Sequence, residues 1–79
     1  MRETEITKIL TTEFICGGME YKVQAEVKIC GKSIMGWSVL KVWAMGANNK
    51  YVRIYPYDLG LWVDGMEIDI SKALQEEVL

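Results

Sequence analysis

The sequence predicts an α+β protein, with a four-stranded antiparallel sheet in meander order, a short extra hairpin and one C-terminal helix. Three observations carry this prediction. Apolar and polar residues alternate with period two along most of the chain, and turns rich in glycine and asparagine separate the alternating segments. After Asp69 the apolar spacing becomes that of a helix. The length of 79 residues suits a single domain, which we assign to residues 1–79.

The first two strands are predicted on either side of a glycine turn. Between Tyr21 and Cys30 the odd positions are apolar or aromatic and the even positions are polar, which is typical of a strand with one face on the core. The preceding segment, Thr4–Ile15, is rich in threonine and isoleucine, which favour a pleated sheet. Its alternation is imperfect, and a bulge or a partly covered second face would explain this. Gly17-Gly18-Met19-Glu20 predicts the hairpin loop between these strands.

The third strand is predicted over Ile34–Met45, after a turn at Gly31-Lys32-Ser33. It has apolar residues on both faces, as in a strand that is buried on two sides or that meets another subunit. Gly36 indicates a bulge or a close backbone approach. A single copy would expose more apolar surface than soluble monomers usually do, so we expect a homodimer. The predicted dimer interface comprises four side chains assigned to one face, Met35, Trp37, Val39 and Trp43.

The fourth strand is predicted over Lys50–Tyr55, between the Gly46–Asn49 turn and Pro56. Val52 and Ile54 should face inward, and Tyr51, Arg53 and Tyr55 should share the other face.

The rest of the chain predicts a small hairpin and then a helix. Asp64-Gly65 favours a tight turn, and two short apolar arms flank it, Leu61–Val63 and Met66–Ile68. Asp69 or Ser71 would then cap a helix of about ten residues, which is too short to be stable without docking on the sheet. The expected docking face of that helix comprises Ile70, Ala73, Leu74 and Val78.

Composition excludes several classes of chemistry. The chain has no histidine, which excludes Ser-His and Cys-His nucleophilic catalysis and removes the commonest metal ligand. Cys16 and Cys30 match no metal-ligand spacing and are interpreted as reduced thiols. The clustered carboxylates of Asp58, Asp64, Glu67 and Asp69 could serve acid/base catalysis or bind a hard cation, but no spacing fits such a site, and they are interpreted as solvated turn residues and a helix cap. We therefore expect no catalysis, no metal, no cofactor and no small-molecule substrate.

The expected compartment is the cytoplasm. The first residues show no secretory signal, and no apolar run is long enough to span a membrane.

Aromatic and basic residues on the fourth strand indicate a candidate nucleic-acid surface. Tyr51, Arg53 and Tyr55 alternate on one predicted face, with Lys41 on the preceding strand and Lys50 at the turn. Aromatic rings on a sheet can stack unpaired bases, and nearby cations can hold phosphates. The alternative is cross-strand packing, because tyrosines stabilise sheets without any ligand. The net charge of −2 provides no global field that would attract DNA or RNA.

The order of elements resembles the SpoVG family of small bacterial septation regulators. The matching segments are Glu5–Ile9, Tyr21–Ile29, Leu40–Val42 with Gly46 and Asn48-Asn49, Tyr51–Pro56, and Ile70–Leu79. The resemblance implies a homodimeric sheet protein with a regulatory role in DNA or RNA binding and without catalysis. The chain departs from the family pattern after Pro56, where Tyr57-Asp58 replaces basic residues. The alternative function is a protein–protein interaction module, of phage or accessory-genome origin, that binds no nucleic acid.

Overall fold

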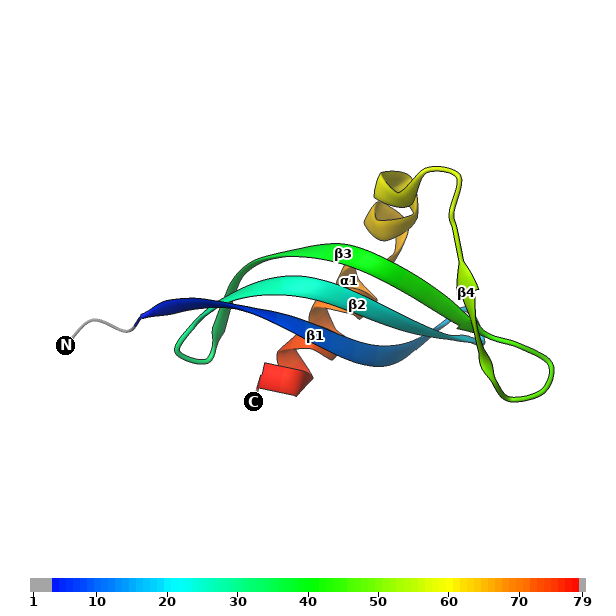
Figure 1. Ribbon diagram of the computed structural model, residues 1–79, viewed down its shortest axis with the longest axis horizontal. Helices are drawn as coiled ribbons and strands as arrows, with labels where there is room; N and C mark the ends of the chain where they lie inside the picture. The colour runs from blue at the N-terminus through cyan, green and yellow to red at the C-terminus, as the bar shows by residue number, and fades with distance from the viewer. Residues whose placement is uncertain (1–3, 79) are drawn as a thin grey trace.

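The computed structural model describes residues 4–78 as four strands followed by one helix (Figure 1). The elements are β1 (Glu5–Cys16), β2 (Met19–Cys30), β3 (Ser33–Met45), β4 (Tyr51–Ile54) and α1 (Leu59–Val78). The strands form one antiparallel sheet in the order β1-β2-β3-β4, and α1 covers one of its faces. The predicted α+β class and meander order are confirmed. Within residues 4–78, no helix combines the length and apolar character needed to cross a membrane.

Two-residue turns join the first three strands. Gly17 and Gly18 have φ values of 61° and 79°, and Cys16 pairs with Met19 across them. Positive φ at both central residues matches the right-handed twist of a hairpin, and glycine adopts it without a steric cost. Gly31 has a φ of 64° in the second turn. These positions explain why the sequence alternation breaks where it does.

Two irregularities in β3 place its apolar residues on the helix-covered face. Ala25 pairs with Val39 and Gln24 with Lys41, so Leu40 is an extra residue. Met35 is extra in the same way at the other end of the strand. Each β-bulge reverses the inward and outward alternation of the strand. The expected bulge near Gly36 is confirmed, whereas β1 pairs with β2 without interruption.

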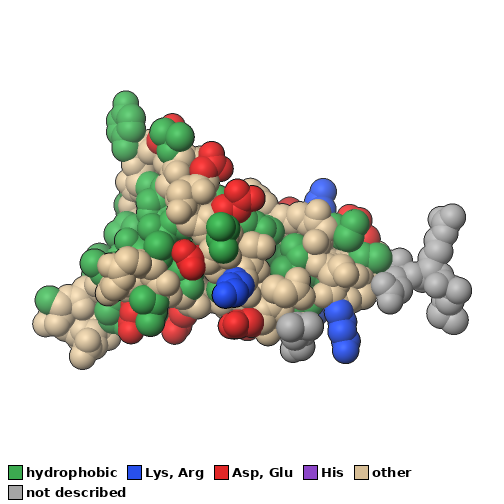
Figure 2. Space-filling view, turned by 180° about the vertical axis from the view of Figure 1, so that it is seen from behind, with side chains coloured by type: hydrophobic (Ala, Val, Ile, Leu, Met, Phe, Trp, Pro, Cys, Tyr) green, Lys and Arg blue, Asp and Glu red, His purple; other side chains and the backbone are tan. Residues whose placement is uncertain are grey.

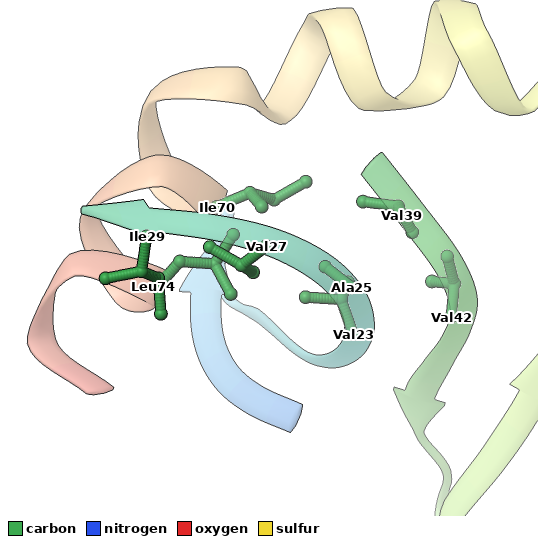
Figure 3. Packing of buried hydrophobic residues seen from close by; sticks show 8 residues of the cluster. All are labelled: Val23, Ala25, Val27, Ile29, Val39, Val42, Ile70 and Leu74. Carbon is green, nitrogen blue, oxygen red and sulfur yellow. The ribbon is translucent and has the colours of Figure 1, made fainter. Parts of the chain in front are cut away.

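The core lies between α1 and the face of the sheet that the odd positions of β2 form. Figure 3 shows the close packing of Val23, Ala25, Val27, Ile29, Val39, Val42, Ile70 and Leu74. The predicted docking face of the helix is confirmed for the three residues that are buried, Ile70, Ala73 and Leu74.

One buried polar residue joins β1 to the helix. Thr12 is 4% exposed, and its hydroxyl donates a hydrogen bond to the carbonyl oxygen of Ala73 at 3.3 Å. This bond satisfies a hydroxyl that would otherwise destabilise the core.

The predicted extra hairpin is wrong, because its residues belong to α1. The helix begins at Leu59 and is 20 residues long, and Asp58 rather than Asp69 or Ser71 caps it. The Asp58 carboxylate accepts a hydrogen bond from the Leu61 amide at 3.1 Å. Trp62 anchors the first turns, with its ring 5.5 Å from that of Tyr21 in an edge-on arrangement.

Candidate functional site

The face of the sheet opposite α1 carries the candidate site, and we call it the open face. No element of residues 4–78 covers it, and its side chains alternate with the buried ones along each strand. The register assigns to it Ile9, Thr11 and Glu13 from β1, Lys22, Gln24 and Glu26 from β2, Lys41 and Trp43 from β3, and Tyr51 and Arg53 from β4.

Aromatic rings and cations alternate along one end of the open face. We call this group the cation–aromatic row, and its order is Tyr51, Lys22, Trp43, Arg53, Tyr55. Nζ of Lys22 lies 4.7 Å from the centre of the Tyr51 ring and 4.8 Å from that of Trp43. Cζ of Arg53 lies 5.7 Å from the Trp43 ring and 4.8 Å from the Tyr55 ring. All four contacts are within the range of cation–π attraction.

Strand pairing explains how distant residues meet in this row. Trp43 pairs with Lys22 on one side and with Arg53 on the other. Directly opposed side chains on one sheet face are close enough to contact each other. Tyr51 and Arg53 are two positions apart and therefore share the face.

The first ring of the row is held by a carboxylate from β1. The hydroxyl of Tyr51 forms a hydrogen bond with Glu13. Partial burial raises the pKa of Tyr51 above its usual value of 10.0, and the charges of Glu13 and Glu20 raise it further. The phenol therefore stays protonated at neutral pH and remains a hydrogen-bond donor.

Arg53 carries an unpartnered donor. Among residues 4–78, no acceptor lies within hydrogen-bonding distance of its Nε, although this atom is buried. A buried N–H without an acceptor costs roughly 1–3 kcal/mol. The guanidinium lies over the rings of Trp43 and Tyr55, and phosphate and carboxylate oxygens are the acceptors that best fit the edge of a guanidinium.

The structure brings together four of the five predicted nucleic-acid residues. Tyr51 and Arg53 belong to the row, and the ring of Tyr55, which follows β4, is 79% exposed. Lys41 lines the same shallow hollow as Arg53 and Tyr55. Lys50 is exposed in the turn before β4, where the Gly46 amide donates to its carbonyl oxygen.

Sequence reasoning missed two members of the row. Lys22 was interpreted only as one of the polar residues of its strand, and Trp43 was assigned to a dimer interface. The available signal was the register, because strands joined by two-residue turns have a fixed pairing. Counting outward from Gly31-Lys32, with allowance for two bulges, brings Trp43 opposite Lys22.

The four residues predicted for the dimer interface do not share a face, so the predicted shared face is wrong and the interface itself stays a prediction. Val39 is 8% exposed and belongs to the core, and Trp37 packs against the core. Trp43 lies on the open face, and Met35 is exposed at a bulge. The predicted shared face assumed strict alternation along β3, and the two bulges reverse that alternation.

Charge is divided between the sheet and the helix. From Glu5 to Ile54 there are seven basic and four acidic residues, and from Asp58 to Val78 there are one basic and six acidic residues. Figure 2 views the side of the molecule on which α1 lies and shows more acidic than basic side chains there. The net charge of −2 thus combines a positive sheet with a negative helix.

Potential metal ligands do not cluster in the described part of the chain. Between residues 4 and 78, no three histidine, cysteine or acidic side chains come close enough to hold an ion. Cys16 and Cys30 are not joined in a disulfide.

These features define a small α+β protein with one helix behind a sheet and a cation–aromatic row on the open face. Comparison of the chain with protein-family models, with curated proteins and with solved structures gave no match.

Proposed function

We propose that this chain is a small, non-catalytic regulatory protein that binds single-stranded DNA or RNA on its open face. The observation that carries the proposal is the cation–aromatic row, which ends in the exposed ring of Tyr55. Unpaired bases stack on such rings with little regard to sequence, because every base has a π-face.

The guanidinium of Arg53 supplies the phosphate contact in this proposal. Its stacking against Trp43 and Tyr55 lowers the conformational freedom that it would lose on binding. The terminal amino groups of the guanidinium would donate to the phosphate oxygens. Lys41 and Lys50 extend the positive surface on either side.

The division of charge supports binding on the sheet rather than on the helix. Phosphate affinity depends on cations near the backbone of the nucleic acid, so the local distribution of charge matters more than the net charge. On the open face the register places four basic side chains, Lys22, Lys28, Lys41 and Arg53, beside four acidic ones, Glu5, Glu13, Glu20 and Glu26, and Lys32 and Lys50 add two cations in turns. The acidic helix would repel the same ligand. The resemblance to the SpoVG family agrees with this proposal and with a homodimer, and the acidic residue after Tyr57 is a departure from that family.

The test is fluorescence anisotropy with labelled oligo-dT and oligo-U at low salt. Tyr55→Ala should weaken binding by about 1–3 kcal/mol, which is the worth of one stacked base. Arg53→Ala should weaken binding and reduce the slope of log affinity against log salt by about 1. Tyr55 is mostly exposed and Arg53 is only partly buried, so circular dichroism should show an unchanged fold.

Lys72→Ala is the matched control, because Lys72 is an exposed cation on α1, away from the open face. Its affinity and salt slope should equal those of the unsubstituted chain. Absence of binding at low salt, or equal losses in Lys72→Ala and Arg53→Ala, would contradict the proposal.

The alternative function is a protein–protein interaction module without nucleic-acid binding. It is favoured by large apolar side chains that are exposed near the free edge of β3 and the start of α1, including Met35, Leu40 and Leu61. Exposed apolar groups of this kind often mark protein interfaces. This alternative predicts that Arg53→Ala leaves the salt dependence of partner binding unchanged.

A further inference from the structure

The outer edge of β3 is only partly paired. β4 pairs with β3 from Val42 to Met45, and no strand of residues 4–78 lies beside Ser33–Lys41 on that side. A free edge presents backbone N–H and C=O groups that can accept another extended chain.

Two adjoining hollows follow this edge. One, of about 250 Å³, is lined by Trp37, Val39, Leu59, Val63 and Asp64 among others. The second, also about 250 Å³, is lined by Lys41, Arg53 and Tyr55, and Leu59 belongs to both. The free edge is therefore bordered by a groove that α1 closes on one side, with an acid at one end and cations at the other.

The bulges limit what this groove can hold. Met35 and Leu40 are the extra residues, so only Gly36–Val39 is regular between them. A long edge strand would lose pairing at each bulge. A short peptide can form its backbone pairing with those four residues alone.

The opposite edge of the sheet differs. Lys8 on β1 points to the helix-covered face, because it is in phase with Leu10 and Thr12. An inward-pointing charge on an edge strand is a known protection against further strand pairing. The segment Gly36–Val39 carries no charge.

From these features we infer that the groove beside Gly36–Val39 binds an extended peptide of another protein, antiparallel to β3. The peptide carries an acidic residue near Lys41 and a basic residue about three positions later near Asp64. A strand advances roughly 3.3 Å per residue, and residues an odd number of positions apart face opposite sides, as Lys41 and Asp64 do. The apolar side chain on the same face as the basic residue contacts Trp37, Leu59 and Val63.

A second copy of the chain fits this groove less well. Two β3 strands related by a two-fold axis at Trp37 would bring their two hollows, each lined by Asp64, to the same side of the paired strands. Like charges close together are unfavourable, whereas a basic residue of a different protein pairs with Asp64.

The groove shares Lys41, Arg53 and Tyr55 with the proposed nucleic-acid surface, whereas the free edge at Gly36–Val39 lies outside that surface. The test uses blocked synthetic peptides. The probe is acetyl-Glu-Val-Thr-Lys-Val-amide, and two controls replace both charged residues by glutamine or the central threonine by proline. Amide NMR of the full chain should show shifts confined to β3 around Gly36–Val39 and to the start of α1. The proline control should not bind, because it lacks an N–H for pairing.

Charge recognition is tested on the protein side. Asp64→Asn and Lys41→Gln should each weaken binding of the charged probe by about two- to fivefold, which is the worth of a surface ion pair. Neither variant should change the affinity of the glutamine control.

Three results would overturn the inference: no binding at millimolar peptide, shifts at β1 instead, or β3 shifts that depend on the concentration of the chain alone. The last result would identify a second copy as the occupant. Tyr55→Ala separates the two proposals, because it should reduce oligonucleotide binding while the probe still shifts Gly36–Val39.

Discussion

At the scale of single residues, the chain orients polar groups by stacking and by local hydrogen bonds. Lys22 lies between Trp43 and Tyr51, and Tyr51 is held by Glu13. The ring contacts restrict the conformations of the Lys22 and Arg53 side chains, so these side chains lose less conformational entropy when a ligand binds. The same contacts stabilise the sheet, so variants of Lys22 or Trp43 would test folding and binding together. Tyr55 is the cleaner probe of binding because it follows β4 and is mostly exposed.

A residue-scale prediction concerns the thiol of Cys16. A hydrogen bond to Asp69 raises its pKa above the usual 9.0, and desolvation and the carboxylate charge act in the same direction. Asp69→Asn should therefore lower the pKa of Cys16 and increase its alkylation by iodoacetamide at alkaline pH, because the thiolate is the nucleophile. Mass spectrometry of the Cys16 peptide measures the rate.

The sign of the linked stability follows from the raised pKa. The folded chain holds the Cys16 proton more tightly than the unfolded chain does. Its stabilising contribution is therefore complete below pH 9.0 and is lost as the pH rises through the folded-state pKa. Asp64→Asn, which removes an exposed carboxylate elsewhere on α1, is the control. An equal alkylation rate for Cys16 in the Asp69 variant and the unsubstituted chain would contradict the assignment.

At the scale of elements, the strands were predictable and the start of the helix was not. Period-two alternation identified β2, and glycines with positive φ marked the turns. Asp64-Gly65 was misread because the same dipeptide occurs in hairpins and on helix surfaces. The helical spacing of Trp62, Met66 and Ile70 was present in the sequence, and the Asp58 cap preceded it. Tertiary packing against Tyr21 overrides the weak local preference at Gly65.

Gly65 supplies an element-scale prediction. It lies within α1, has no positive φ, and a Cβ built there meets nothing within 4 Å. Gly65→Ala should therefore raise the free energy of unfolding by about 0.5–1 kcal/mol, since alanine loses less backbone freedom in a helix. Urea unfolding measures the change.

Gly18→Ala is the contrasting variant, because a φ of 79° strains any side chain although space is open. It should lower the free energy of unfolding. Destabilisation by Gly65→Ala would show that the segment around Gly65 is not regular helix in solution.

At the scale of the whole molecule, the length of α1 changes the argument for a dimer. The homodimer was predicted because a helix of about ten residues would leave apolar sheet surface exposed. The helix has 20 residues and buries Val39 and part of Trp37. The homodimer stays a prediction, and sedimentation velocity over a range of concentrations tests it. A sedimentation coefficient of a single copy at all concentrations would reject it.

The candidate site was predictable only where one strand carried it. Alternation along β4 identified Tyr51, Arg53 and Tyr55 as neighbours. The partners from β2 and β3 depend on a register that two bulges shift, and the sequence marks only one of these with a glycine. The charge division was likewise hidden in the net value, because it appears only when the helix and the sheet are counted separately.

The charge division gives a prediction that net charge alone does not. Lys50→Gln with Glu67→Gln removes one cation from the turn before β4 and one anion from α1, so the net charge stays at −2. Lys72→Gln with Glu67→Gln also conserves the net charge but removes both groups from α1. If phosphates contact the open face, only the first pair should weaken oligonucleotide binding and reduce the salt slope by about 1.

Anisotropy titrations of both pairs at several salt concentrations make the measurement. Equal affinities for the two pairs would mean that the distribution of charge does not direct the nucleic acid. A loss in the Lys72 pair would indicate contact with the helix instead. Because the two proteins carry the same total charge, a difference between them reports where the ligand lies, independently of the long-range field of the molecule.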